Sequence, residues 1–358
     1  MMGFDHGGTV FAVARSLGLA PEELLDFSAS INPLGMSPGV REAVCAALDR
    51  SLHYPDSEAT ELCAALARLH GVADDSVCVA NGSTELIYLL PRLVQGRRAL
   101  VIAPPFSEYA KALTIAGYEI EYLDLSPADG FALPMEQLAA RLSGGIDLLF
   151  LCNPGNPTGR LYLRPEVKRV ISLCADCEVF LVLDEAFMDF CEDESSKLAL
   201  VAAGNAVLLR SMTKFYAMPG LRLGYALASK EIAGRLRRLR APWSVNTPAQ
   251  VAGLVSLSDE DYRRRTIDCI ATERDFLFRS LSSLPGVHPY PSAANYLLAE
   301  LEAGMTAATL SERLLRERIL IRDCSSFRGL TDRFFRVAVR SRRENLILSD
   351  ALGRALLG

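Results

Sequence analysis

The segment from Ser211 to Tyr225 places one lysine among residues that could bind a phosphorylated aldehyde. Lys214 has a hydroxyl residue, Ser211, three positions before it and an arginine, Arg222, eight positions after it. A hydroxyl and a guanidinium bind phosphate through hydrogen bonds, and an amine beside them would form an imine with the aldehyde carbon. Because Lys214 follows a predicted strand, Ala206–Arg210, we favour this chemistry over the usual role of lysine as a solvated surface charge.

A second candidate is the acid that ends the apolar run Leu181-Val182-Leu183. A carboxylate at the end of a buried strand is costly unless it meets a cation. The protonated ring nitrogen of a heterocyclic cofactor is such a cation, and Asp184 would keep that nitrogen protonated. An aspartate that caps the next turn is the alternative, and this residue alone does not decide between the two.

Two loops that follow predicted strands extend this set. The loop Cys152–Gly159 contains two prolines and two glycines, which fix its shape. Asn156 in this loop could donate to an oxygen on the cofactor ring, with an ordinary proline-rich turn as the alternative. The other loop contributes Gly82, Ser83 and Thr84, whose backbone amides and hydroxyls at the start of a helix would attract a phosphate.

The order and spacing of three of these residues carry a resemblance. Asn156, Asp184 and Lys214 follow one another at intervals of 28 and 30 residues. This succession resembles the fold-type I pyridoxal-phosphate (PLP) enzymes, the aspartate aminotransferase superfamily. The resemblance implies pyridoxal 5'-phosphate as the cofactor, with Lys214 and Asp184 as catalytic residues. It also implies an α/β fold, in which a large domain with a mostly parallel seven-stranded sheet is followed by a small α+β C-terminal domain.

The same resemblance assigns roles to two tyrosines. Tyr109 matches the aromatic residue that stacks on the cofactor ring, although a plain core tyrosine is a reasonable alternative. Tyr54 matches a tyrosine that in relatives reaches the cofactor phosphate of the neighbouring subunit. We therefore expect a homodimer with its active sites at the interface.

The N-terminal region contains residues that suit a phosphorylated substrate. His6 and Asn32 can hydrogen-bond a phosphate, and Gly7 lets the chain approach a ligand closely. A frayed chain end is the alternative for His6. These segments are similar to the start of the L-threonine-O-3-phosphate decarboxylases of cobalamin biosynthesis. The similarity continues through residues 184–187, 211–216, 242–246, 294–298, 319–322 and 335–341.

Two arginines near the ends of predicted strands complete the expected substrate site. In relatives the residues matching Arg322 and Arg336 bind the acidic groups of the substrate, and Arg336 is the usual carboxylate partner. A small phosphorylated amino acid suits this pair, because each guanidinium forms bidentate charge-assisted bonds; Asn156 is a further expected contact. Arg340 is a weaker candidate, for which surface salt bridging is the alternative. The resemblance thus implies decarboxylation of L-threonine O-3-phosphate to CO2 and (R)-1-amino-2-propanol O-2-phosphate.

Two other functions are weighed against the decarboxylase. The first is an aminotransferase acting on histidinol phosphate or an aromatic amino acid. Many histidinol-phosphate aminotransferases have a tyrosine where this chain has Phe187, which cannot hydrogen-bond the ring oxygen, so Phe187 favours the decarboxylase branch. The second is a PLP-binding regulator or scaffold. Only about 35 residues precede the first helix of the large domain, too few for a DNA-binding module.

The elements that must position these residues alternate along the chain. Short apolar runs alternate with helical patterns, which indicates a layered α/β domain. We expect an N-terminal arm at 1–36, a large domain at 37–240 and a small domain at 241–358, the last with a long helix at about 259–284. The expected strands of the large sheet are Ser76–Ala80, Ala99–Ala103, Glu119–Leu123, Asp147–Cys152, Glu178–Leu183, Ala206–Arg210 and Leu223–Ala228.

Composition limits the partners and the compartment. A formal net charge of -5 gives no electrostatic case for nucleic acid or an anionic membrane as a partner. No apolar run reaches membrane-spanning length, and no secretory signal is recognised. The nine cysteines contain no C-x-x-C pair, which points to reduced thiols and a cytoplasmic protein.

Overall fold

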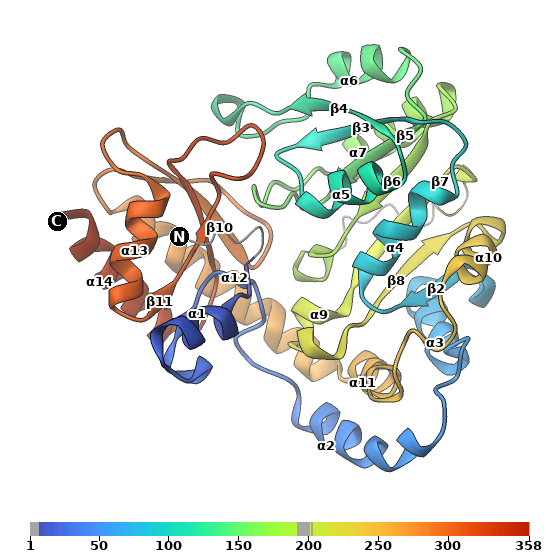
Figure 1. Ribbon diagram of the computed structural model, residues 1–358, viewed down its shortest axis with the longest axis horizontal. Coiled ribbons are helices and arrows are strands. Elements are labelled where there is room, and N and C mark those ends of the chain that lie inside the picture. Colours follow the sequence, from blue (N-terminus) through green and yellow to red (C-terminus); the bar gives the residue numbers. More distant parts are fainter. Residues whose placement is uncertain (1–6, 192–200, 202, 358) are drawn as a thin grey trace.

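The computed structural model describes residues 7–191, 201 and 203–357. Figure 1 shows a large domain built on a seven-stranded sheet and a small domain built on a four-stranded sheet, with the N-terminal segment beside the small domain. The predicted fold class, α/β with a large and a small domain, is confirmed. His6 lies outside the described residues.

The large sheet has the strand order β2-β8-β7-β6-β5-β3-β4. All neighbouring pairs are parallel except the two that involve β8, so the sheet is mostly parallel, as predicted. All seven predicted strands are present, with ends shifted by one or two residues. They are β2 (Val77–Ala80), β3 (Arg98–Ala103), β4 (Glu119–Asp124), β5 (Leu148–Cys152), β6 (Phe180–Asp184), β7 (Ala206–Ser211) and β8 (Gly224–Ala228).

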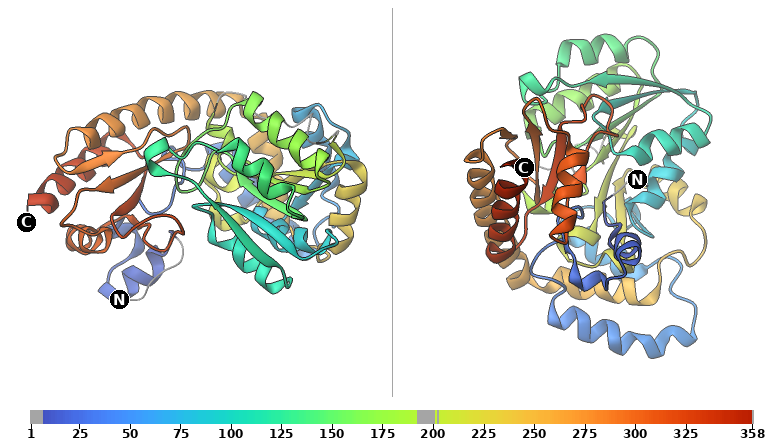
Figure 2. Two further views of the ribbon diagram at one scale, coloured as in Figure 1. Left: turned by 90° about the horizontal axis from the view of Figure 1, so that it is seen from above. Right: turned by 60° about the vertical axis from the view of Figure 1, so that its left-hand side comes forward.

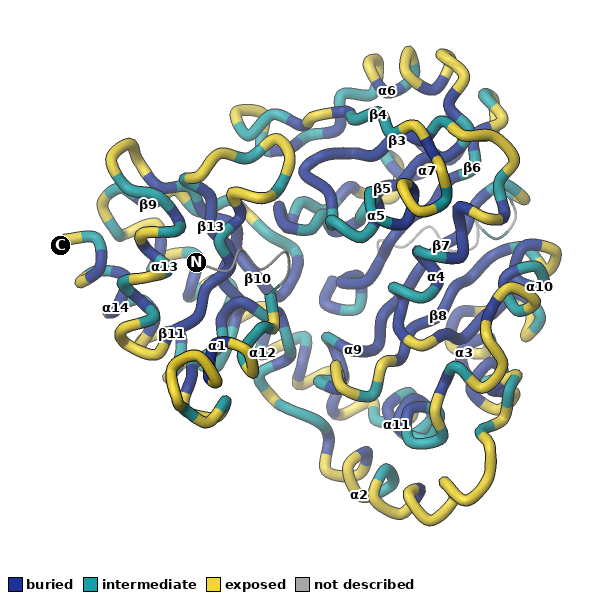
Figure 3. Tube along the Cα trace, viewed as in Figure 1, coloured by how far each residue is buried: buried dark blue, intermediate teal, exposed yellow. Residues whose placement is uncertain are grey.

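Both faces of this sheet are covered, which explains why its inner strands are apolar at nearly every position, whereas the edge strand β4 is polar at several positions and largely unburied. Leu149, Leu151 and Leu181 point into one core, which also contains residues of α3, α6 and α7. Phe150 and Val182 point to the opposite face, where α4, α5 and α10 cover them. Figure 3 shows the strands as buried and the outer helix faces as exposed. The helices are α3 (Thr60–His70), α4 (Ser83–Leu89), α5 (Ser107–Ile115), α6 (Met135–Leu142), α7 (Arg164–Asp176) and α10 (Lys230–Leu239).

The small domain is an antiparallel sheet of order β12-β13-β10-β9 packed against helices. The long helix predicted at about 259–284 is α12, which Figure 2 shows along one side of this domain. A parallel pair, β1 and β11, ties the N-terminal arm to the domain. The elements are α1 (Val10–Leu17), β1 (Leu25–Asp26), α12 (Glu260–Ser282), β9 (Val287–Pro289), β10 (Tyr296–Leu301), α13 (Ala307–Arg316), β11 (Ile319–Leu320), β12 (Arg322–Asp323), β13 (Phe334–Ala338) and α14 (Arg342–Leu357).

Two further helices, α2 (Pro38–Ala47) and α11 (Thr247–Ser258), pack against each other below the large sheet. Ser37 precedes α2, and its hydroxyl donates to Asp259 Oδ2 at 2.6 Å and does not cap the helix. Among the described helices, none is long and apolar enough to cross a membrane.

The sheet brings the predicted chemistry to one edge. Cys152 and Asp184 are register partners at the carboxyl ends of β5 and β6. The next strand, β7, ends at Ser211 and leads directly into the short helix α9 (Met212–Phe215), which carries Lys214. Ligands of parallel sheets bind at this edge, and here the sheet places the amine and the carboxylate on neighbouring connections.

Candidate active site

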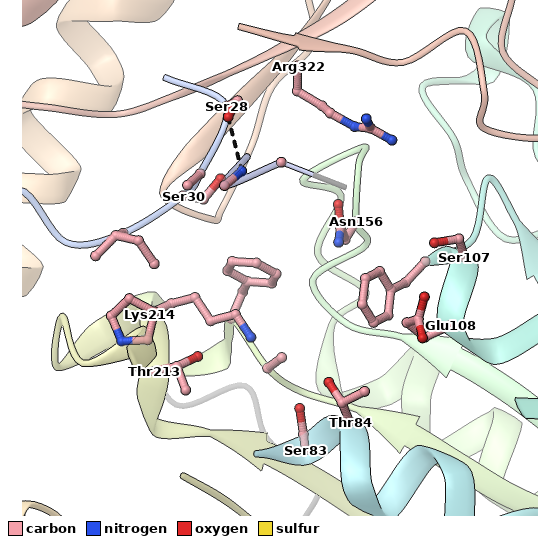
Figure 4. A pocket seen from close by; sticks show the side chains of 18 of the residues that line it. Ser28, Ser30, Ser83, Thr84, Ser107, Glu108, Asn156, Thr213, Lys214 and Arg322 are labelled. Carbon is pink, nitrogen blue, oxygen red and sulfur yellow. Dashed lines mark hydrogen bonds between the residues drawn. The ribbon is translucent and has the colours of Figure 1, made fainter. Parts of the chain in front are cut away.

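A cavity of about 750 Å³ lies between the two domains. The N-terminal arm contributes Gly7, the large domain contributes Asp184 and Lys214, and the small domain contributes Arg322 and Arg336. Figure 4 shows the Lys214 side chain and Arg322 on opposite sides of this space, with Asn156 between them. The cavity therefore brings together residues that are far apart in the sequence.

Lys214 presents a partly buried amine. Its Nζ donates to Ser211 Oγ at 3.0 Å, and Ser211 Oγ lies 2.9 Å from Thr213 Oγ1. Burial lowers the pKa of Lys214 to about 8, an effect that the Asp184 carboxylate opposes and the Arg222 guanidinium reinforces. A lysine with this pKa has a substantial neutral fraction near neutral pH, as a nucleophilic amine requires.

Asp184 is a buried carboxylate held by two donors. Its Oδ2 accepts the Tyr109 hydroxyl at 2.6 Å, and its Oδ1 accepts the backbone N–H of Ala186 at 3.0 Å. Burial raises the pKa of Asp184, and the bond from Tyr109 partly opposes that rise. The Tyr109 ring lines the cavity and stacks on Phe150 with centroids 4.8 Å apart. Tyr109 therefore contacts the very carboxylate with which a cofactor nitrogen would pair.

The loop between β2 and α4 lies against Arg222. Gly82 has a φ of +78°, and a Cβ there would lie 2.8 Å from Arg222 Nη2. A Cβ at Gly224 would lie 2.3 Å from the backbone N of Ser83. Both positions therefore require glycine, because any side chain would separate the loop from β8 and Arg222. Ser83, Thr84 and Arg222 all line the cavity, so three of the residues predicted to hold a phosphate lie together, whereas Ser211 and Gly82 are not part of the lining.

Arg322 and Arg336 are register partners on the antiparallel strands β12 and β13. Arg336 donates to Asn156 Oδ1 through Nη1 and to the Ser28 carbonyl, at 3.1 Å, through Nη2. Figure 4 shows the Asn156 nitrogen on the side of the group that faces away from Arg322. This orientation is compatible with donation from Asn156 to a group bound at Lys214, which stays a prediction.

The structure corrects the expected substrate contact of Asn32. Its Nδ2 donates to Phe215 O at 2.8 Å, Tyr262 Oη at 2.9 Å and Thr266 Oγ1 at 2.8 Å. Asn32 is buried at the junction of the arm, α9 and α12, and it does not line the cavity. Its amide is fully used in joining these elements, so it has no donor left for a phosphate.

Of the remaining predicted residues, Gly7 lines the cavity, whereas Tyr54 and Arg340 do not. Gly7 lines the cavity, and a Cβ there would lie 2.1 Å from the Ser28 carbonyl oxygen, so only glycine fits. Tyr54 does not line the cavity; it is 78% exposed and stacks on Trp243 with centroids 4.4 Å apart. Arg340 also lies outside the cavity lining, where it pairs with Glu344 at 2.7 Å.

Several cavity residues were not found from the sequence. Ser30 lines the cavity, and its buried hydroxyl has no hydrogen-bond partner among the described residues. Thr213 also lines it, and the alternation of hydroxyl residues at 211 and 213 beside Lys214 could have revealed it. Phe327 reaches the cavity from the loop after β12, and Ser107 reaches it from the first position of α5, so only the fold shows them.

The donor set fits PLP. A nucleophilic amine, a buried carboxylate and a glycine-lined loop beside an arginine match the aldehyde, the ring nitrogen and the phosphate of that cofactor. Three buried polar atoms of cavity-lining residues, Ser30 Oγ, Ser107 Oγ and Arg336 Nε, have no partner within the described part of the chain. Buried polar groups are normally hydrogen-bonded, so these atoms indicate a site built for polar ligands.

Comparison with known proteins decides the family. The sequence pattern of the family described as aminotransferase class I and II matches residues 22–352. The chain belongs to the aminotransferase class I and II family. As a member of this family, it takes PLP as its cofactor.

The chain is similar to individual members of the family that have two different activities. The chain is 42% identical over 355 residues to the threonine-phosphate decarboxylase of Salmonella typhimurium, covering 99% of this chain and 97% of that protein. The structure of L-threonine-O-3-phosphate decarboxylase from Porphyromonas gingivalis matches with a TM-score of 0.83 and 29% identity, covering 94% of this chain and 100% of that one. Histidinol-phosphate aminotransferase from Clostridium acetobutylicum gives 0.85 at 28% identity, covering 92% and 98%. The two solved structures therefore match this chain almost equally well, and the higher sequence identity, 42%, is with a threonine-phosphate decarboxylase.

Proposed function

We propose that this protein is a PLP-dependent decarboxylase that converts L-threonine O-3-phosphate into 1-amino-2-propanol O-2-phosphate and CO2, for the aminopropanol arm of cobalamin. The observation that carries the proposal is the cross-strand pair Arg322 and Arg336 in the same cavity as Lys214. Two guanidiniums suit a substrate with both a phosphate and a carboxylate. The identity of 42% with a threonine-phosphate decarboxylase along nearly the whole chain supports the same substrate.

Each part of the cofactor has a residue to hold it. Lys214 would hold its aldehyde carbon, Asp184 would pair with its ring nitrogen, and Ser83, Thr84 and Arg222 would bind its phosphate. When bound, PLP supplies an electron-poor ring that accepts the electrons of the bond broken at the substrate's α-carbon. The negative charge of Asp184 would keep the ring nitrogen protonated, and Tyr109 and Ala186 fix the direction of that carboxylate.

The chain's own residues orient the substrate and move its proton. We assign the phosphate chiefly to Arg322, with Ser30 and Gly7 beside it, and the carboxylate end to Arg336, which Asn156 and Ser28 hold in place. Phosphate contacts supply most of the binding, because a tightly held carboxylate would stabilise the ground state. Lys214, with a pKa of about 8, holds a proton that it can deliver to the α-carbon after CO2 leaves.

We also propose that the protein is a homodimer and that it is located in the cytoplasm. Leu48, Leu52 and Tyr54, near the start of the large domain, have exposed apolar side chains, and Tyr54 stacks on the exposed Trp243. Such surfaces are typical of subunit contacts, and a Tyr54 exposed in one chain is free to reach a second one. All nine cysteines are unpaired, which supports a reducing compartment. The mass in solution, measured by light scattering, tests the dimer, and a monomer at working concentration would refute it.

The test of the reaction is CO2 release from L-threonine O-3-phosphate, with and without 2-oxoglutarate. We expect equal rates of CO2 release in both mixtures and an amine phosphate as the product. Transfer of the amino group to 2-oxoglutarate, with no CO2, would show an aminotransferase instead. Histidinol phosphate with the same acceptor serves as the matched control and should give no glutamate.

A further inference from the structure

The loop that connects β12 to β13, residues 324–333, bridges the two domains at the cavity. We propose that the ion pair between Arg328 of this loop and Asp124 of the large domain positions Arg322, the residue to which we assign the substrate phosphate. Arg328 is in this account a positioning residue, because it acts through Arg322 and touches neither substrate nor cofactor. The identity of the ligand at Arg322 rests on the proposed function, whereas the positioning itself does not.

The ion pair has a fixed geometry. Arg328 Nε lies 2.8 Å from Asp124 Oδ1, and Arg328 Nη2 lies 3.1 Å from Asp124 Oδ2, so the two groups form a bidentate contact. The guanidinium also lies over the Tyr122 ring, 4.4 Å from its centroid. Asp124 and Tyr122 both belong to β4, the edge strand of the large sheet, which the loop approaches from the small domain. Two carboxylate contacts and a ring contact hold Arg328 more rigidly than a single ion pair would.

The two residues before Arg328 contact Arg322. Arg322 Nη2 donates to Ser326 Oγ at 3.2 Å, and its guanidinium carbon lies 5.3 Å from the centroid of the Phe327 ring. Phe327 and Arg322 both line the cavity. Ser326 and Phe327 contact Arg322, and the next residue, Arg328, contacts Asp124 of the large domain. Three consecutive loop residues therefore connect the cavity arginine to the large domain.

Backbone hydrogen bonds join the loop residues that contact Arg322 and Asp124 into one short segment. The N–H of Phe327 donates to Cys324 O at 3.0 Å, and the N–H of Leu330 donates to Phe327 O at 3.1 Å, so residues 324–330 form consecutive turns. Gly329 has a φ of +84° directly after Arg328, a conformation that glycine adopts without strain. A shift of Arg328 would thus move Phe327 and Ser326 together.

The exposure of this ion pair predicts how its removal should affect stability and ligand affinity. The Arg328 and Asp124 side chains are 53% and 48% exposed, and exposed ion pairs contribute little to global stability. Removing the pair should therefore leave the fold intact but free the loop, so that Arg322 adopts its binding position in only a fraction of molecules. Affinity for the phosphorylated ligand falls by that fraction, while the reacting groups at Lys214 are unchanged.

A double-mutant cycle on the PLP-loaded enzyme tests this proposal. Arg328→Ala and Asp124→Ala should each raise KM for L-threonine O-3-phosphate by about 3- to 10-fold, with kcat within about 2-fold of the original value. The double variant should be no worse than either single variant, because the two residues act as one unit. Arg328→Lys should recover part of the loss. Arg354→Ala is the control, because it removes an exposed arginine paired with Glu317 in the same domain.

Three further readouts do not depend on turnover. Calorimetric affinity for inorganic phosphate should fall in both single variants, amide hydrogen exchange in residues 324–333 should rise, and PLP affinity should not change. Unchanged KM and phosphate affinity, additive losses in the double variant, or an equal loss in Arg354→Ala would overturn the proposal. If the unmodified enzyme releases no CO2 from L-threonine O-3-phosphate, the proposed function fails, and phosphate affinity and exchange still decide whether Arg328 positions Arg322.

Discussion

The Tyr109 hydroxyl donates a 2.6 Å hydrogen bond to Oδ2 of Asp184, the carboxylate that ends β6. The tyrosine comes from α5 and the acid from the sheet, so the contact joins two elements at the base of the cavity. The bond stabilises the ionised form of a carboxyl group whose burial raises its pKa. Tyr109 therefore influences how strongly Asp184 can hold a positive charge on the cofactor.

Tyr109→Phe should lower kcat by about 10-fold while the protein keeps its fold. The variant retains the ring but removes the donor, so the pKa of Asp184 rises further, and one pKa unit corresponds to about 1.4 kcal/mol. The pH titration of the cofactor absorbance should shift with kcat, which a purely structural role would not cause. Tyr162→Phe is the control, because the Tyr162 hydroxyl donates to Phe131 O, at 3.1 Å, and Tyr162 does not line the cavity. Equal effects in both variants would contradict the role of Tyr109.

The rate of PLP loading should depend on pH through Lys214. The neutral amine is the attacking form, so the rate should rise as pH increases through the pKa of about 8 and level off above about pH 9. An unshifted lysine, with a pKa of 10.5, would still gain rate above pH 9. The growth of the visible absorbance band measures the rate, and Lys214→Ala, which lacks the amine, should show no such band. A plateau only above pH 10 would refute the lowered pKa.

Arg322→Ala should reduce kcat/KM for L-threonine O-3-phosphate by about 10- to 100-fold, because charge-assisted hydrogen bonds contribute about 1.5–3 kcal/mol. PLP affinity should stay within about 2-fold, since we assign the cofactor phosphate to Ser83, Thr84 and Arg222. Arg340→Ala is the matched control, because Arg340 pairs with Glu344 outside the cavity. Equal losses of PLP affinity and of kcat/KM would mean that Arg322 has a structural role.

Asn32→Ala should lower the stability of the protein, whereas Ser30→Ala should weaken substrate binding. Loss of the three hydrogen bonds of Asn32 leaves buried partners unsatisfied and should lower the free energy of unfolding by about 2 kcal/mol. Ser30→Ala removes a hydroxyl without a partner among the described residues, so the thermal midpoint should not change while KM rises about 3-fold. Thermal denaturation and steady-state kinetics on both variants check this. A lower midpoint in Ser30→Ala would contradict the assignment.

The large sheet can be predicted from the sequence because the patterns that indicate its strands lie within short stretches of the chain. Most of its strands are apolar runs, and Asp184 and Ser211, which follow two of these runs, lie at the carboxyl edge of the sheet. The domain limits at 36/37 and 240/241 stay predictions. The packing of α11 against α2 and α3 associates residues 247–258 with the large domain.

The substrate side was less predictable because it depends on long-range packing. Asn32 and Ser30 are two residues apart in one segment, and only the position of α12 determines which side chain is used for packing. The contact between Arg328 and Asp124 joins residues 204 positions apart in the sequence, and neither residue lies in a recognisable motif. Such contacts follow from how the two domains meet, which no local pattern encodes.

The central claim is that the substrate's carboxylate leaves while its amino group stays. Incubating the PLP-loaded enzyme with L-threonine O-3-phosphate labelled with ¹⁵N, in heavy water and with 2-oxoglutarate present, tests both parts in one mass spectrum. The account predicts an amine phosphate that retains the ¹⁵N and carries a carbon-bound deuterium in place of the carboxylate. Recovery of the ¹⁵N in glutamate, with the carboxylate still on the substrate carbon, would contradict it.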